Sequence, residues 1–374
     1  MIPFNKPYLT GRETEYIAHA VASGKISGNG EYTKKCQTFF EARYRFAETL
    51  LTTSCTDALE MAALLINCKE GDEVLVPSYT FVSSALAFVR EGAKVLFVDS
   101  QKQNPNMDVA TLEPLITKMT KAIVVVHYAG VAVDMDTIMA LAKKYNLYVI
   151  EDAAQAVDAT YKGKPLGGIG HLGCFSFHET KNIISGEGGM LVVNDEKLRA
   201  RAEVLWEKGT NRASFFRGEI NKYGWVDTGS SFLPSEIVAA FLYAQLENLD
   251  KIQDRRKEIW TNYYQSLRPL QELDKVKLPV IPEYASNNAH MFYLVCNSIE
   301  ERSKLIVFLK SRDVHAVFHY LSLHKSEFYL KHNELVHLPN SDKFTDCLVR
   351  LPFFYELSHK DQNYIIDSII QFYA

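Results

Sequence analysis

Lys181 stands in a sequence context that could make it reactive, because it follows the aromatic segment Phe175-Ser176-Phe177. A lysine amine that its surroundings keep neutral can bond covalently to a carbonyl carbon, such as the aldehyde of pyridoxal 5'-phosphate (PLP). Ser176, on the same segment, could donate a hydrogen bond to a phosphate group. Most lysines are solvated surface charges. Other motifs must therefore decide whether Lys181 has a chemical role.

A carboxylate motif, Glu151-Asp152-Ala153-Ala154-Gln155, ends an apolar run upstream of Lys181. Asp152 could pair with a protonated pyridine nitrogen, which is a recognised partner of carboxylates in PLP enzymes. Gln155, expected one helical turn further on, could reach the phenolic oxygen of the same ring. The alternative is that Asp152 only caps the helix that follows.

A group of small polar residues, Thr53-Ser54-Cys55-Thr56-Asp57, precedes an apolar helix expected over residues 58–66. The free N–H groups and the dipole of a helix N-terminus favour an anion such as phosphate. The alternative is an ordinary N-cap. Phe81, after Ser78-Tyr79-Thr80, could stack on a cofactor ring or belong to the core.

The segment Gly168-Ile169-Gly170-His171-Leu172-Gly173 matches the G-x-G-x-x-G pattern of dinucleotide-binding proteins. That pattern binds a dinucleotide only where it follows a strand and opens a helix. Here it follows the turn 162–165 and leads into the aromatic strand at Phe175. We therefore reject a nicotinamide site.

Apolar runs alternate with helical patterns in the first half of the chain, which predicts an α/β fold with a mostly parallel central sheet. The runs that predict strands buried on both faces are 73–77, 94–99, 122–127 and 147–152. Residues 134–146 predict a helix with Asp134 as its N-cap. Ligands bind at the carboxyl ends of such strands, where Ser78, His127 and Asp152 fall.

The pattern changes after Ser235, where a long helix is expected over residues 235–267. A helix at 303–310 and a strand at 315–320 follow it. We predict a large cofactor-binding domain over residues 1–245 and a smaller α+β domain over residues 246–374.

The composition is that of an ordinary globular protein, with 374 residues, 47% hydrophobic and 23% charged residues. A net charge of −4 gives no broad electrostatic reason to expect nucleic-acid or anionic-membrane binding. The six cysteines lack any C-x-x-C pair or zinc-like spacing, so we expect reduced thiols and no metal site. Without an apolar signal segment or a run long enough to span a bilayer, we expect a cytoplasmic protein.

Taken together, the motifs resemble the DegT/StrS family of sugar-nucleotide aminotransferases, and the resemblance covers nearly the whole chain. Its most specific parts are Gly71-Asp72-Glu73-Val74 with Pro77-Ser78, Glu151 to Gln155, Ser176-Phe177 with Lys181-Asn182, and Glu187-Gly188-Gly189. The resemblance implies the aspartate aminotransferase fold (PLP fold type I). It also implies these roles: Lys181 as the Schiff-base lysine, Asp152 at the pyridine nitrogen, Gln155 at the ring oxygen, Phe81 stacked on the ring, and Ser176 with the backbone around Cys55, Thr56 and Asp57 at the phosphate.

One segment departs from the family. Members commonly have Gly-x-Asn-x-Arg before the long helix, with the Asn donated across a dimer to the cofactor phosphate, whereas this chain has Ser231 in its place. That contact is then a shorter hydroxyl bond or absent. The resemblance implies a homodimer with active sites at the subunit interface.

A narrower similarity is to the branch that makes TDP-4-amino-4,6-dideoxygalactose for enterobacterial common antigen. It is carried by segments such as 127–131, 176–181 and 208–212. Members that act at sugar C3 tend to have Tyr in place of His178 and Gly-Asp-Gly in place of Gly186-Glu187-Gly188. The similarity therefore favours amination at C4, with C3 amination as the alternative.

The resemblance implies a two-stage reaction. L-glutamate leaves its amino group on the cofactor as pyridoxamine 5'-phosphate (PMP), and a TDP-linked keto sugar then takes it up. Residues suspected of contacting the substrates are Arg212, Arg217, His319, Tyr320 and His324, although surface roles are equally compatible with the sequence. Two other functions stay open. Dehydration at sugar C3 is disfavoured because those relatives replace the lysine with His, and a non-catalytic regulator is disfavoured by the full set of cofactor residues.

Overall fold

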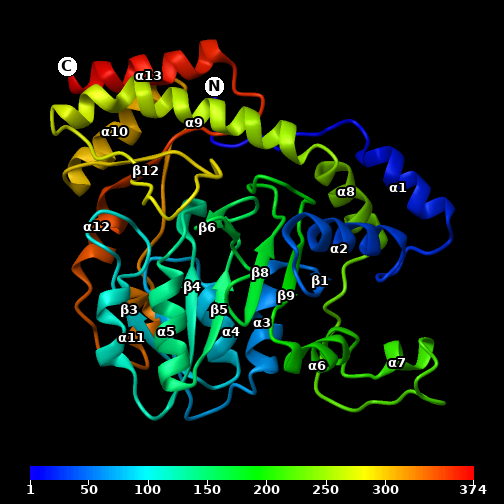
Figure 1. Cartoon of the computed structure of the whole chain (residues 1–374). Coiled ribbons are helices and arrows are strands. Elements are labelled where there is room, and N and C mark those ends of the chain that lie inside the picture. Colours follow the sequence, from blue (N-terminus) through cyan, green and yellow to red (C-terminus); the bar gives the residue numbers. More distant parts are fainter.

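A seven-stranded sheet lies at the centre of the molecule (Figure 1), in a computed structural model that describes residues 1–374. Its order is β1-β9-β8-β5-β4-β2-β3, in which β9 runs antiparallel to both neighbours and all other neighbours are parallel. The strands are β1 (Thr49–Thr52), β2 (Glu73–Pro77), β3 (Lys94–Val98), β4 (Thr120–Val126), β5 (Tyr148–Asp152), β8 (Leu172–Ser176) and β9 (Gly189–Val193). The predicted mostly parallel sheet and its four predicted strands are confirmed.

Helices cover both faces of this sheet because successive strand residues face opposite sides. Leu75 packs in the core cluster that includes residues of α2, α5 and α8, whereas Val74 and Val76 pack in the cluster of α3, α4 and α6. The helices of this part are α1 (Glu13–Ala22), α2 (Glu31–Tyr44), α3 (Cys55–Leu65), α4 (Ser83–Arg90), α5 (Met135–Tyr145), α6 (Glu196–Trp206), α7 (Arg212–Phe216) and α8 (Glu236–Leu246). Asp134 caps α5 as predicted, because its side chain accepts from the Thr137 N–H.

The C-terminal part has a hydrophobic core of its own, drawn from residues between 259 and 369. Figure 1 shows α13 (His359–Tyr373) alongside α9 (Leu249–Glu272), above the central sheet. The other helices of this part are α10 (Ile299–Ser311), α11 (Glu327–Leu330) and α12 (Pro339–Cys347). Its three-stranded sheet has the order β10 (Tyr293–Val295), β12 (Leu348–Arg350) and β11 (Val317–Phe318), and η4 (Leu323–Lys325) is a 3₁₀ turn. The first half of the chain also has the hairpin of β6 (Thr160–Tyr161) and β7 (Lys164–Pro165) and the 3₁₀ turns η1 (Val109–Thr111), η2 (Glu113–Leu115) and η3 (Tyr128–Gly130). No helix combines the length and the apolar character needed to cross a lipid bilayer.

The N-terminal segment joins this C-terminal part. The Ile2 N–H donates to the Asp313 carbonyl at 2.7 Å, and the Ile2 carbonyl accepts from His315 at 3.1 Å. The Phe353 N–H donates to the Phe4 carbonyl at 3.1 Å. The domain boundary between residues 245 and 246 stays a prediction. The N-terminal segment belongs to the first predicted domain by sequence but bonds to residues of the second.

Three predicted elements differ from the structure. The long helix expected over 235–267 is two helices, since Asn248 has a non-helical backbone and its side chain donates to the Ala244 carbonyl. The strand expected over 315–320 is only Val317–Phe318, the two residues that pair with β12. Asp152 is followed by turns and not by a helix, so it caps no helix.

Helix α2 is capped from a distance by Glu236, the first residue of α8. Gly30 at the α2 N-cap has no side chain to accept the free N–H groups. The buried Glu236 carboxylate accepts from the N–H groups of Gly30 (2.9 Å), Tyr32 (2.7 Å) and Thr33 (3.1 Å) and from the Thr33 hydroxyl. Negative charge at a helix N-terminus is favourable, so this contact ties two distant segments together.

We expect Glu236→Ala to lower the free energy of unfolding by about 3 kcal/mol, because it leaves several buried N–H groups without an acceptor. The measurement is the urea midpoint, compared at equal slope. Glu15→Ala is the control, since Glu15 is an exposed helix carboxylate paired only with Arg12. Equal midpoints for the two variants would contradict the capping role.

Candidate functional site

A cavity of about 500 Å³ opens at the carboxyl ends of β4, β5 and β8, beside the N-terminus of α3. It brings together most of the residues singled out in the sequence. Those on its wall are Cys55, Thr56, Phe81, Asp152, Gln155, Ser176, Lys181, His319 and Tyr320. Residues separated by more than 250 positions in the chain thus share one small volume, as the sheet topology predicts.

Lys181 lies in the loop between β8 and β9, in a turn where its N–H donates to the His178 carbonyl at 2.9 Å. Burial lowers the pKa of its ammonium group, against the opposing effect of Cys55 and Asp152, and the positive charge of Arg350 lowers it further. A lysine in these surroundings reaches the neutral, nucleophilic form more readily than a surface lysine.

Asp152 ends β5 with a side chain that is 6% exposed. The Ser84 hydroxyl donates to one carboxylate oxygen at 2.6 Å and the Ala154 N–H donates to the other at 3.2 Å. Burial raises the pKa of this carboxyl, although the Ser84 hydrogen bond opposes the shift. A cationic N–H in the cavity would complete its hydrogen bonding and favour its ionised form.

Gln155 is held so that its amide N–H₂ faces the cavity. Its Oε1 accepts from the Ala129 N–H at 2.6 Å, which leaves Nε2 to donate to the Tyr320 hydroxyl at 3.2 Å. Phe81 contacts the same Tyr320 ring, with 6.1 Å between ring centroids. The Phe81 side chain is 56% exposed, so the structure excludes the alternative that it belongs to the core.

The N-terminus of α3 forms a polar end of the cavity. Ser54 caps the helix by accepting from the Asp57 N–H at 3.1 Å, and the Thr56 hydroxyl bonds to Ser83 at 2.7 Å. Gly189 allows β9 to pass against this turn, because a Cβ there would lie 2.4 Å from the Cys55 nitrogen. Helix capping and an anion cradle, which the sequence presented as alternatives, are therefore compatible here.

Five predicted residues lie outside the cavity wall, and two of them, Asp57 and His324, are engaged in contacts within the fold. The Asp57 side chain bonds to Thr53, and the Asp57 N–H is already used by Ser54. His324 is fully buried, and its Nδ1 shares a hydrogen bond of 2.7 Å with the Ser78 hydroxyl. His324 thus joins η4 to the end of β2, and its sequence position alone could not show that it faces away from the cavity.

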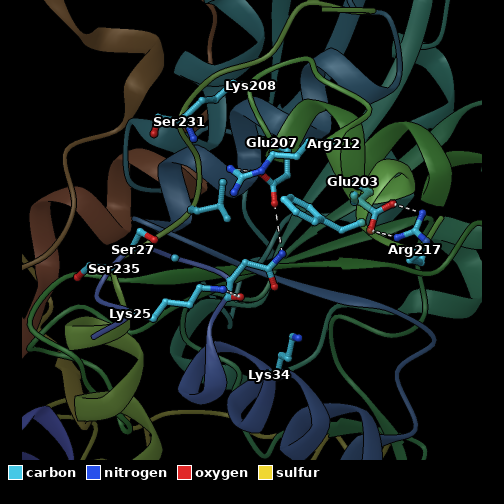
Figure 2. A pocket seen from close by; sticks show the side chains of 15 residues that line it. Lys25, Ser27, Lys34, Glu203, Glu207, Lys208, Arg212, Arg217, Ser231 and Ser235 are labelled. Carbon is cyan, nitrogen blue, oxygen red and sulfur yellow. Dashed lines mark hydrogen bonds and ion pairs between the residues drawn. The ribbon is translucent and has the colours of Figure 1, made fainter. Parts of the chain in front are cut away.

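Arg212, Arg217 and Ser231 line a second cavity, of about 780 Å³, together with Lys25, Lys34 and Lys208 (Figure 2). Arg217 pairs with Glu203 at 2.6 Å and with Glu219 at 2.7 Å. Ser231 forms a β-bridge with Glu207. Within one chain the structure does not bring these three predicted residues to Lys181.

The start of the rejected G-x-G-x-x-G segment, together with Gly167 just before it, binds a carboxylate of the chain itself. Glu151 accepts from the N–H groups of Gly167 (2.8 Å), Ile169 (2.7 Å) and Gly170 (2.6 Å). His127 Nε2 adds a fourth contact at 2.9 Å and carries the proton, since its Nδ1 accepts from the Val133 N–H. The loop that could bind a dinucleotide phosphate is thus filled by Glu151, which fixes the strand that presents Asp152.

The cavity residues match the functional groups of PLP. The α3 N-terminus and Ser176 suit the phosphate, Asp152 suits the pyridine nitrogen, and the amide of Gln155 suits the phenolic oxygen. Phe81 offers a ring face, and Lys181 offers an amine for the aldehyde. Sequence reasoning missed Ser84, which orients Asp152, and Arg350, which lines the cavity from β12. No motif marks either residue.

Comparisons with known proteins agree with this geometry. The model of the DegT/DnrJ/EryC1/StrS aminotransferase family matches residues 7–370. GDP-perosamine synthase of Escherichia coli O157:H7 is 35% identical over 100% of this chain and 99% of its own length. Spore coat polysaccharide biosynthesis protein SpsC of Bacillus subtilis is 30% identical over 98% and 96%. Spr1654 of Streptococcus pneumoniae in its PMP form superposes with a TM-score of 0.92 at 26% identity, covering 100% of this chain and 99% of that one.

We expect Asp152→Asn to stabilise the cofactor-free protein at neutral pH, because burial disfavours the ionised Asp152 of the wild type. Below the ordinary carboxyl pKa of about 3.9, the folded and unfolded states are both protonated and the charge-dependent part of the difference disappears. As the pH rises through the raised pKa, the wild type loses stability relative to the variant. Thermal midpoints from about pH 4 to about pH 8 measure this.

Asp134→Asn is the matched control. Burial tends to raise the Asp134 pKa, but hydrogen bonds from Thr137 and Tyr161 bring it below its ordinary value. That substitution should therefore destabilise the protein at neutral pH, and the loss should shrink as the pH falls through the lowered pKa. Parallel pH profiles for the two variants would contradict the assignment of Asp152 as a carboxylate short of a cation.

Proposed function

Because this chain belongs to the DegT/DnrJ/EryC1/StrS aminotransferase family, we propose that it aminates C4 of TDP-4-keto-6-deoxyglucose with L-glutamate as donor. It is a PLP-dependent sugar aminotransferase, as the family and its solved members show. The product is a TDP-4-amino-4,6-dideoxyhexose for a cell-surface polysaccharide. The observation that supports the reaction is the placement of Lys181, Asp152 and Gln155 on one cavity wall.

Each residue contributes a defined step. Bound PLP supplies an electron sink for the bond broken at the donor carbon. Lys181 Nζ takes the proton from the α-carbon of glutamate and later delivers a proton to the sugar carbon, since burial lowers its pKa and so favours the neutral, basic amine. Asp152 holds a proton at the pyridine nitrogen, and Ser84 keeps that carboxylate in place.

The preference for C4 is supported by two residues that distinguish the branches of the family. His178 and Glu187 both line the cavity, and His178 Nε2 lies 3.7 Å from Glu187 Oε1. Tyr and Asp, which C3 enzymes tend to have at these positions, would present a different surface to the sugar. The name of one relative, GDP-perosamine synthase, specifies a GDP-linked sugar, so the choice between TDP and GDP requires its own experiment.

We also propose a homodimer in which each chain completes the site of the other. Phe216 and Trp225, in the arm that contains α7, are 69% and 82% exposed. Figure 1 shows this arm extending from the body of the molecule to the right of α6. Large exposed apolar side chains are typical of interfaces. In the proposed dimer, Arg212, Arg217 and Ser231 of one chain reach the Lys181 cavity of its partner.

The first test is spectroscopic. The purified holoenzyme should absorb visible light, L-glutamate should bleach this absorption, and TDP-4-keto-6-deoxyglucose should restore it. Lys181→Ala should remove the band and slow amination at least about 1,000-fold, whereas Lys162→Ala, at an exposed lysine paired with Asp136, should change neither.

If only a GDP-linked keto sugar restores the absorption, the proposed chemistry stands and the assignment of a TDP-linked substrate is wrong. Product NMR distinguishes C4 from C3, and an amine at C3 would overturn the positional assignment. Bound cofactor without any sugar product would instead indicate a regulatory protein.

The shared site is tested by mixing two inactive variants, Lys181→Ala and the double variant Arg212→Ala/Arg217→Ala. If the arginines act across the interface, each mixed dimer has one intact site, and random mixing restores roughly a quarter of the wild-type activity. If they act within their own chain, mixing restores none. A monomer in sedimentation experiments would refute the dimer itself.

A further inference from the structure

Arg350 is the one arginine on the wall of the Lys181 cavity. It ends β12, the middle strand of the three-stranded sheet, and pairs with Tyr293 of β10 and Val317 of β11. One face of its guanidinium lies over the Phe4 ring, 4.8 Å from the centroid. Strand pairing thus fixes the Arg350 backbone on both sides, and the Phe4 ring packs against one face of its guanidinium.

No acidic residue of the chain pairs with this guanidinium, and its buried Nε has no hydrogen-bond partner. Arg256, which is buried, differs in this respect, since it donates to the carbonyls of Ala289 (3.1 Å) and His290 (2.6 Å). Arg350 as a whole is partly buried and lines the cavity, and a cation withdrawn from water without a partner is costly to a fold, so an anionic ligand in the cavity would stabilise it. Burial lowers the pKa of Arg350, but the phenols of Tyr128 and Tyr320 favour its charged form.

We propose that Arg350 binds a carboxylate of the amino donor, L-glutamate. This rests on the proposed function only for the identity of the donor. The planar guanidinium matches a carboxylate in a two-point contact. The cofactor phosphate has its own place at the α3 N-terminus, with Thr56 and Ser176, whereas Arg350 enters with His319 from the C-terminal part. An anion bound by Arg350 also lies in the same cavity as the Lys181 amine that must reach the donor α-carbon.

The test separates the two half-reactions of the holoenzyme in single turnovers. With L-glutamate, Arg350→Gln should raise the apparent Kd at least about 100-fold, because a charge-assisted pair is lost. With TDP-4-keto-6-deoxyglucose added to the PMP form, the apparent Kd should stay within about threefold of the wild type. Arg350→Lys retains the positive charge but cannot make the two-point contact of a guanidinium, so it should raise the apparent Kd for glutamate about tenfold.

Arg199→Gln is the matched control, because the Arg199 Nε is likewise buried without a partner but lies on α6, outside the cavity. It should leave glutamate binding unchanged. Calorimetric titration of the PMP form with 2-oxoglutarate gives a readout independent of turnover and should show the same loss in Arg350→Gln.

Weakened sugar-nucleotide binding with normal glutamate binding would assign Arg350 to the diphosphate and overturn the proposal. Equal effects of the Arg350 and Arg199 variants on glutamate would also overturn it. If Arg350→Gln does not fold, the Lys variant and the titration decide the question. Failure of the wild type to use the keto sugar would refute the proposed substrate and leave the glutamate result standing.

Discussion

The removal of Lys181 and Asp152 from water in one cavity is the constraint on which the site depends. Burial shifts both groups toward their neutral forms, the lysine by lowering its pKa and the aspartate by raising it. A neutral amine is what a nucleophile requires, and a carboxylate short of a cation is what a pyridine nitrogen requires. The parallel sheet brings these groups together because the ends of β5 and β8 meet at one edge.

Three buried carboxylates in this chain show how hydrogen bonding separates structural from chemical roles. Glu236 and Glu151 each accept from several N–H groups and need no further partner. Asp152 has only the Ser84 hydroxyl and one N–H. The two saturated carboxylates fix α2 and the Gly167–Gly170 loop, and the unsaturated one faces the cavity. Structural and reactive acids of the same burial are thus distinguished by their donors.

Local sequence was sufficient to predict a feature when all the residues that define it lie in a single helix or strand. The apolar runs located the strands within a residue or two, and the small hydroxyl residues located the N-terminus of α3. The break at Asn248 was missed because it depends on a side chain that competes for helix carbonyls. Ser84 and Arg350 were missed because their roles arise only when the folded chain brings α4 to Asp152 and β12 to the cavity. His324 was misplaced for the same reason, since its contact with Ser78 joins residues 246 positions apart in the chain.

The junction between the segment Ile2–Phe4 and residues 313–353 has a consequence for synthesis on the ribosome. Phe4 covers the guanidinium of Arg350, and its carbonyl is bonded only once Phe353 is present. A nascent chain that has emerged through Lys181 already contains the lysine and Asp152 but not this closure. Translation order therefore lets this closure of the cavity form only after Phe353 has left the exit tunnel, long after Lys181 and Asp152 have emerged.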